Sequence, residues 1–206
     1  MTSKRAHCSR CCRPQSTCLC QHIRLCSNRW PVTLLQHTAE ACHPKGTAVI
    51  AQLALSKIIT LPFTDSDSLD SAFLTAHNLD RAALIYPSDH SQEPLANIDT
   101  LRQEPPRPLL FIDATWRKSK ALLLRSPGLQ ALPRFSFSPT SAPRYRIRKA
   151  SRPHFYSTLE AIAATLEGVE LGSDYSPLLE AMDAVVESQL EFRRAGKSTS
   201  KTKREI

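Results

Sequence analysis

The sequence has 206 residues, of which 41% are hydrophobic and 22% are charged, and this length suits one globular domain with a small appendage. No apolar run approaches the roughly 18 residues that a membrane helix needs, and residues 1–14 lack the apolar centre of a secretory signal. These features argue against a membrane-spanning or secreted protein and predict a cytoplasmic one.

The formal net charge is +8, and the positive charge gathers in three segments. Residues 1–30 carry six Lys or Arg and no acid, residues 144–152 carry five and no acid, and residues 193–206 are basic as well. Such clusters favour a phosphate-rich partner, since each phosphate contact releases counterions, although a basic surface can also simply face water. We therefore predict a nucleic acid partner, and nothing in the sequence indicates an obligatory protein partner.

The chain divides into three parts by composition. Residues 1–30 form a basic, cysteine-rich segment, called the head below, residues 31–192 form the main domain, and residues 193–206 are expected to be a disordered tail. In the head, two residues separate Cys8 from Cys11 and one separates Cys18 from Cys20, with six residues between the pairs.

In a chain without a secretory signal, this spacing indicates a metal site rather than disulfides. Four thiolates make a closed, structural zinc site, and we predict zinc bound by Cys8, Cys11, Cys18 and Cys20. Cys12 could replace Cys11, although that would break the two-residue spacing. The alternative is a set of free thiols in a flexible arm.

Short apolar runs alternate with amphipathic ones in the main domain. We expect strands at 32–36, 82–87 and 108–113, and helices at 47–59, 66–77, 116–126, 157–168 and 176–193. Ser157 and Glu160 have the spacing of a capping box at the start of one helix. Alternation of strand and helix predicts an α/β fold with a mainly parallel sheet flanked by helices.

Ligands of such sheets bind in loops beyond the carboxyl ends of the strands, here Pro87-Ser88 and Asp113-Ala-Thr-Trp116. Asp113 is a candidate proton acceptor, although Asp commonly caps a following helix. Thr115 could likewise bind a ligand or cap the helix. Trp116 offers a stacking face for a base, or it packs in the core.

Basic side chains that could contact RNA are Lys45, Arg117, Lys118, Arg144, Arg148 and Lys149. If residues 144–149 are extended, Arg144, Arg146 and Arg148 share one face. That face could meet phosphates, one arginine could clamp a carboxylate, or the strand could only be solvated. Lys45 precedes a predicted helix start, where anions bind well.

The Asp113-Ala-Thr115-Trp116 motif after an apolar strand resembles the signature of DTW-domain proteins. Residues 36–55, 84–88 and 145–163 and the cysteines of the head are similar to further blocks of that family, so the resemblance covers about residues 8–190. Thr38 departs from the pattern, since proline is expected after the histidine. This departure lies outside the strand-end loops.

The resemblance implies a SPOUT-like fold, an α/β sheet with a knotted cofactor-binding region. It also implies a tRNA-uridine aminocarboxypropyltransferase, which moves the 3-amino-3-carboxypropyl group of S-adenosylmethionine to N3 of a uridine and releases 5′-methylthioadenosine. The catalytic residues expected on this basis are Asp113, Thr115 and Trp116. The expected contacts of S-adenosylmethionine are Tyr86, Pro87, Ser88, Ile112, Asp113, Thr115, Tyr145 and Arg146.

A general base suits this chemistry, because uridine N3 is mostly protonated near neutral pH and a positioned base contributes about 10²–10⁴-fold. Asp113 is the natural candidate. Two other hypotheses remain: an RNA methyltransferase of SPOUT type that uses the same cofactor, and a non-catalytic RNA-binding module with a zinc-containing head.

Overall fold

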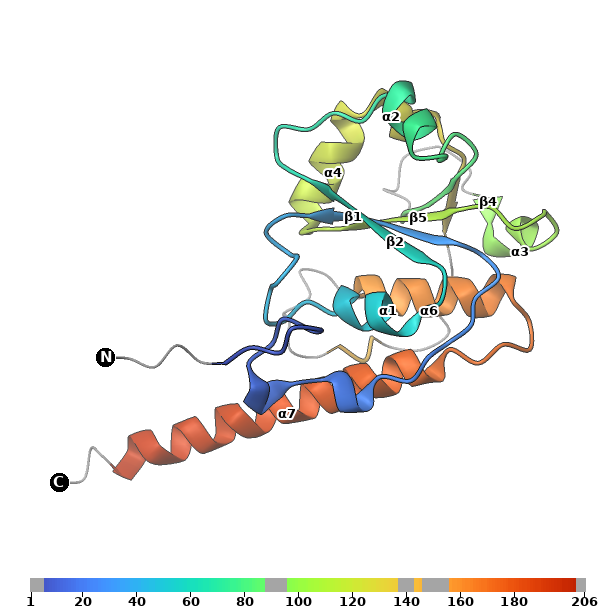
Figure 1. The fold of residues 1–206 in the computed structure, drawn as a ribbon. Helices are drawn as coiled ribbons and strands as arrows, with labels where there is room; N and C mark the ends of the chain where they lie inside the picture. The colour runs from blue at the N-terminus through green and yellow to red at the C-terminus, as the bar shows by residue number, and fades with distance from the viewer. Residues whose placement is uncertain (1–5, 88–95, 137–142, 146–155, 203–206) are drawn as a thin grey trace.

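The protein is described by a computed structural model that covers residues 6–87, 96–136, 143–145 and 156–202. A single sheet lies between two layers of helices (Figure 1). In the described part of the chain the sheet has six strands in the order β2-β1-β5-β3-β6-β4, and each described pair is parallel. The predicted α/β fold with a mainly parallel sheet is therefore confirmed.

The strands are β1 (Val32–His37), β2 (Ile58–Phe63), β3 (Ala83–Ile85), β4 (Ala96–Asn97), β5 (Leu109–Asp113) and β6 (Arg134–Ser136). The α-helices are α1 (Ala48–Ala54), α2 (Ser71–Ala76), α3 (Ile98–Leu101), α4 (Trp116–Arg125), α5 (Pro127–Ala131), α6 (Thr158–Val169) and α7 (Ser176–Thr202). Two short 3-10 helices, η1 (Gln15–Thr17) and η2 (Cys20–His22), lie in the head.

The central strands β1, β3 and β5 fall on the apolar runs predicted from the sequence. Every residue of β1 is buried, as expected for a strand covered on both faces. The predicted helix at 47–59 is wrong in its second half, because α1 ends at Ala54 and β2 begins at Ile58. The run of β-branched residues in β2 pairs with β1. This strand pairing decides the conformation from Ile58 on, although the apolar residues before it recur with the period of a helix.

The two faces of the sheet carry separate cores. Leu109 and Phe111 of β5 point to one core, which α1, α3, α6 and α7 cover, while Leu110 points to the other, which α2, α4 and α5 cover. Because side chains alternate along a strand, Asp113 falls on the same face as Leu109 and Phe111, toward α6.

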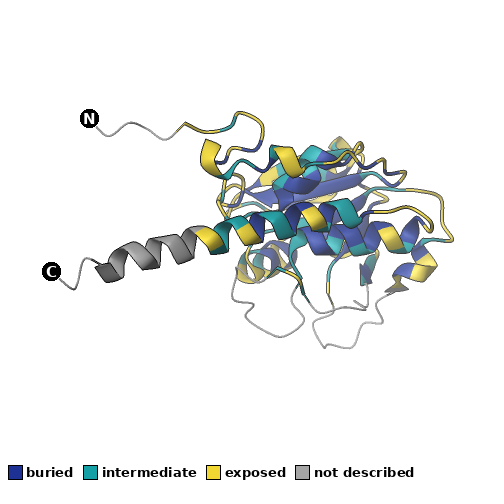
Figure 2. Ribbon diagram, turned by 90° about the horizontal axis from the view of Figure 1, so that it is seen from below, coloured by how far each residue is buried: buried dark blue, intermediate teal, exposed yellow. Residues whose placement is uncertain are grey.

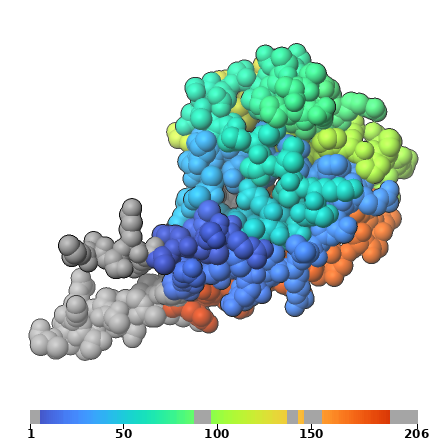
Figure 3. All heavy atoms as spheres, viewed as in Figure 1, coloured from blue at the N-terminus to red at the C-terminus, as the bar shows by residue number. Residues whose placement is uncertain are grey.

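The head is built into the main domain. Cys11, Leu19 and Trp30 belong to the larger core, together with residues of α6 and α7. Figure 3 shows the head as part of one continuous surface with its neighbours. Thus the described part of the head, residues 6–30, differs in composition from the main domain but shares its core.

Helix α7 buries one face along the body of the protein (Figure 2). Its buried side chains recur at helical spacing: Leu178, Ala181, Met182, Val185 and Val186. The sequence predicts a disordered tail from residue 193, whereas the helix extends to Thr202. No proline interrupts the chain after Pro177, and residues 187–194 are rich in good helix formers. In the described ranges, no helix has both the length and the apolar character needed to cross a bilayer.

Glu170 joins the end of the head to the segment before α7. Its side chain is 5% exposed and accepts hydrogen bonds from the N–H groups of Arg29 (2.8 Å) and Trp30 (2.9 Å) and from the hydroxyl of Tyr175 (3.0 Å). Burial raises the pKa of the Tyr175 phenol, and its hydrogen bond to Glu170 adds to this effect. A single carboxylate therefore accepts three hydrogen bonds, two of them from the buried residues Trp30 and Tyr175.

Replacing Glu170 by alanine should lower the free energy of unfolding by about 2–5 kcal/mol, because buried donors lose their acceptor. Glu167→Ala is the matched control, since Glu167 lies on the exposed side of α6, whose C-cap residue is Glu170, and its effect should stay within about 0.5 kcal/mol. Urea denaturation of both variants measures the difference. An equal loss of unfolding free energy in the two variants would contradict the structural role assigned to Glu170.

Candidate active site

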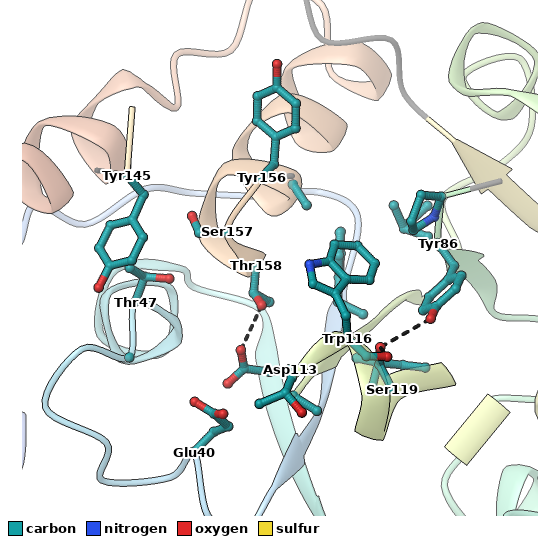
Figure 4. Close-up of a pocket in the computed structure, with 18 of the residues that line it drawn as sticks. Glu40, Thr47, Tyr86, Asp113, Trp116, Ser119, Tyr145, Tyr156, Ser157 and Thr158 are labelled. Carbon is teal, nitrogen blue, oxygen red and sulfur yellow. Dashed lines mark hydrogen bonds between the residues drawn. The ribbon is translucent and has the colours of Figure 1, made fainter. Parts of the chain in front are cut away.

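A cavity of about 400 Å³ opens beyond the carboxyl ends of β1, β3 and β5, beside the first residues of α4 and α6 (Figure 4). Its volume lies in the range of small-molecule sites, roughly 300–1,000 Å³. The cavity therefore lies where the sequence predicts a ligand site, in the loops beyond the carboxyl ends of the strands. The predicted site residues that line it are Lys45, Tyr86, Pro87, Ile112, Asp113, Thr115, Trp116, Arg117 and Tyr145.

Asp113 is the last residue of β5 and is held from two sides. Gln36, its register partner on β1, donates its amide to Oδ2 at 2.9 Å, and the hydroxyl of Thr158 donates to Oδ1 at 2.7 Å. Figure 4 shows Thr158 reaching this carboxylate from the start of α6. These two donors fix the orientation of the carboxylate at the cavity wall.

The alternative that Asp113 caps helix α4 is wrong, because the N-cap residue of α4 is Thr115. The side chain of Thr115 makes no capping hydrogen bond and lines the cavity instead. The side chains of Asp113 and Thr115 therefore do not cap α4, and both are placed to contact a ligand in the cavity.

An aromatic pair forms another part of the wall. Trp116 is 37% exposed, and its ring meets that of Tyr86 edge-on, with centroids 6.2 Å apart. The Tyr86 hydroxyl lies 3.2 Å from Ser119 Oγ, which donates to the Trp116 carbonyl at 3.1 Å. Trp116 is thus a partly exposed ring at the cavity and not a core residue.

The loop between β1 and α1 forms the opposite side. Glu40 is 8% exposed, and Figure 4 shows its carboxylate on the same side of the cavity as that of Asp113. The hydroxyl of Tyr145 donates to the Lys45 carbonyl at 2.6 Å, and Arg13 of the head donates to the Gly46 carbonyl at 2.8 Å. The head therefore supports the loop.

Sequence reasoning missed several lining residues, namely Glu40, Thr47, Ser119, Tyr156 and Thr158. The capping box of α6 is confirmed, since Ser157 Oγ accepts from the Glu160 N–H and Glu160 accepts from the Ser157 N–H. The alternation of side chains along β1 could have predicted that Gln36 belongs to the site. No local pattern links Thr158 to Asp113, because they meet only through the packing of α6.

Two predicted RNA contacts do not line the cavity. Lys118 Nζ lies 3.0 Å from Asp65 and lowers the pKa of that carboxyl, and Arg144 forms an ion pair with Asp183 of α7. Their charges are therefore partly neutralised within the protein. Four further predicted residues lie outside the described part of the chain: Ser88, Arg146, Arg148 and Lys149.

The four head cysteines come together as the spacing predicts. The sulfur atoms of Cys8, Cys11, Cys18 and Cys20 all lie within 4.8 Å of one another. Cys8 and Cys20 are 3.7 Å apart, and Cys11 and Cys18 are 3.8 Å apart. Tetrahedral zinc with bonds of about 2.3 Å requires sulfurs about 3.8 Å apart, so the set could hold a metal ion.

The backbone N–H groups of Cys11 and Arg10 lower the pKa of the Cys8 thiol to about 6, whereas burial and the neighbouring Cys8 side chain raise the pKa of the Cys20 thiol to about 12. Ionisation of all four thiols therefore needs the positive charge that a bound metal ion would supply. Cys12 is exposed and lies outside the set, so it does not replace Cys11.

Together these features define an α/β protein with a carboxylate in a strand-end cavity and a four-cysteine cluster beside it. The DTW domain model matches residues 5–190, and the chain belongs to this family. It is similar to tRNA-uridine aminocarboxypropyltransferase 2 of Drosophila melanogaster, with 29% identity over 176 residues that cover 82% of this chain and 68% of the relative. No solved structure matches the chain significantly.

We expect the purified protein to contain one metal ion per chain, measured by elemental analysis. Cys8→Ser combined with Cys18→Ser should abolish it, whereas Cys12→Ser, outside the set, should retain it. Because a structural metal couples to folding, chelation should also expose the head to proteolysis. Full metal content in the double variant would refute the assignment.

Proposed function

We propose that the protein is a tRNA-uridine aminocarboxypropyltransferase, which forms a 3-amino-3-carboxypropyl group on N3 of a uridine. The observation that carries the proposal is the Asp113 carboxylate, oriented by Gln36 and Thr158 at a cavity with an aromatic wall. Membership of the DTW family and similarity to a protein of that name support the same activity.

S-adenosylmethionine is the proposed second substrate. It supplies the transferred group on a positively charged sulfur, and the departing 5′-methylthioadenosine is neutral. The cavity volume suits a ligand of this size, and Tyr86 and Trp116 offer ring surfaces to a base. The remaining contacts would come from Pro87, Ile112, Thr115 and Tyr145, with Ser88 and Arg146 outside the described residues.

Asp113 would accept the N3 proton as the N3 lone pair forms its bond to the transferred carbon. The bond between that carbon and sulfur breaks, and its electron pair stays on sulfur. Asp113 then returns the proton to water, so the carboxylate is regenerated. Gln36 and Thr158 would hold the carboxylate in the required orientation throughout.

Zinc is the proposed occupant of the cysteine cluster, with a structural role, because four thiolates leave no open coordination position. We further propose a SPOUT-like fold with a knotted cofactor-binding region.

The proposed RNA substrate is a tRNA. Lys45 and Arg117 line the cavity and are available to meet phosphates near the target uridine. The basic residues Lys118, Arg144, Arg148 and Lys149 would extend this contact, and a cytoplasmic location would bring the protein to its substrate.

The decisive experiment incubates the purified protein with tRNA and S-adenosylmethionine and analyses the nucleosides and by-product by mass spectrometry. We expect the modified uridine together with methylthioadenosine. S-adenosylhomocysteine with a methylated base would instead identify a methyltransferase, and tRNA binding without turnover would identify a binding module.

Asp113→Asn should reduce the rate of transfer by about 10²–10⁴-fold at neutral pH, because the amide cannot accept the N3 proton. Affinity for S-adenosylhomocysteine should change only a few fold. Raising the pH should partly restore the variant, because solvent then deprotonates the uridine. A variant that folds normally and transfers at the wild-type rate would remove Asp113 from the chemistry.

Trp116→Ala should weaken binding of a nucleoside ligand by about 5- to 150-fold, which corresponds to the roughly 1–3 kcal/mol of one stacked base. Trp116→Phe is the control that keeps an aromatic face and should recover most of the loss. Titration calorimetry with S-adenosylhomocysteine and with tRNA shows which ligand uses the ring. Unchanged affinity for both would contradict a stacking role.

A further inference from the structure

We propose that His43 and Gln189 are positioning residues for the cavity, because they hold residues 43–46 in one conformation before a ligand binds. This segment lies between β1 and α1, and its last two residues, Lys45 and Gly46, line the cavity. Neither His43 nor Gln189 is among the described residues that line it. The inference rests on the proposed function, since its binding test uses the proposed site for S-adenosylmethionine.

Every backbone carbonyl of the segment 43–46 accepts a hydrogen bond. The donors lie in four parts of the chain: the loop itself, α7, the residues before α6 and the head. In order along the segment they are the Gly46 N–H (2.7 Å), the Gln189 amide (3.0 Å), the Tyr145 hydroxyl (2.6 Å) and the Arg13 guanidinium (2.8 Å). Water could satisfy the carbonyls of a partly exposed loop without fixing its shape, whereas donors on packed elements hold it.

The side chain of His43 caps the turn that leads into the cavity wall. Its Nδ1 accepts from the Lys45 N–H at 3.2 Å, and its backbone N–H donates to the Glu40 carbonyl at 3.1 Å. An N–H that binds a side-chain acceptor two residues earlier is the arrangement of an Asx turn, so the imidazole takes the part that Asn or Asp plays in other turns. Together with its carbonyl, His43 thereby binds the N–H groups of both lining residues, Lys45 and Gly46.

The turn at Gly46 is also closely packed. A methyl group at this position would lie 3.1 Å from the His43 carbonyl oxygen, closer than ordinary van der Waals contact. Close packing and a full set of hydrogen bonds leave the segment few alternative conformations. A cavity wall that is already ordered avoids the entropy cost of ordering on binding, which increases affinity for a ligand.

Gln189 brings a remote helix into this arrangement. Helix α7 contacts α1 and α6, and Val185, one turn before Gln189, is buried in the larger core. This packing fixes the position from which the Gln189 amide reaches the Pro44 carbonyl. No described residue of α7 lines the cavity, so a substitution at Gln189 should affect ligand binding through the segment rather than by direct contact.

The test combines binding of S-adenosylhomocysteine, measured by calorimetry, with hydrogen–deuterium exchange of residues 43–46 in the ligand-free protein. In the wild-type protein the Lys45 and Gly46 N–H groups should exchange slowly. His43→Ala and Gln189→Ala should each speed exchange of the segment and weaken binding about fivefold, as expected for loss of about one hydrogen bond. Saturating S-adenosylmethionine orders the segment again, so KM should rise while kcat stays within about twofold.

His43→Asn is the matched variant for His43→Ala, because the amide oxygen of Asn can accept from the Lys45 N–H in an Asx turn. It should recover most of the affinity and most of the protection from exchange. Glu187→Ala is the control for Gln189→Ala, since Glu187 is exposed on the same helix and makes none of the hydrogen bonds of the segment. This control should leave binding and exchange unchanged.

Unchanged exchange in both alanine variants, or no recovery in His43→Asn, would overturn the inference. A lower kcat with unchanged KM would also overturn it, since the residues would then act on the chemical step. A wild-type protein that does not bind S-adenosylhomocysteine would refute the proposed function instead, and the exchange comparison would still test the order of the segment. If His43→Ala does not fold, Gln189→Ala with its Glu187→Ala control still decides the result.

Discussion

The register between β1 and β5 is the constraint on which the site depends. It sets Gln36 beside Asp113, so the amide reaches the carboxylate at 2.9 Å. A slip of one residue would turn Asp113 to the opposite face of the sheet and away from Thr158. Leu109 and Leu110, in separate cores, oppose such a slip. Ordinary apolar packing thus decides where the Asp113 carboxylate lies.

Much of the fold follows from local patterns, because the buried strands are uninterrupted apolar runs and the helices carry caps. Val32–His37 and Leu109–Asp113 have the signature of strands covered on both faces. Two of the three missed strands, β4 and β6, lack such a signature. Ala96–Asn97 and Arg134–Ser136 are too short to show a period, and they form strands only because a neighbouring edge pairs with them.

The residues of the candidate site that lie at strand ends could be predicted from the sequence. Those that reach it only through packing between distant segments could not. Asp113, Thr115 and Trp116 follow directly from the end of β5. Thr158, which donates a hydrogen bond to Asp113, lies instead on α6, far away in the sequence. Lys118 belongs to the same short segment but points to Asp65, since neighbouring positions of a helix face different directions. Sequence proximity therefore does not define the cavity.

Arg13 connects the cysteine cluster to the cavity. Its guanidinium is buried between the head and the main domain and donates to the Gly46 carbonyl of the loop that carries Glu40. If a metal ion in the cluster orders Arg13, it also orders the loop, and the two binding equilibria are then linked. In that case a ligand held by the loop would tighten metal binding by the same factor by which the metal tightens the ligand. The hydrogen bond from Arg13 thus gives the head a means of affecting the cavity from outside it.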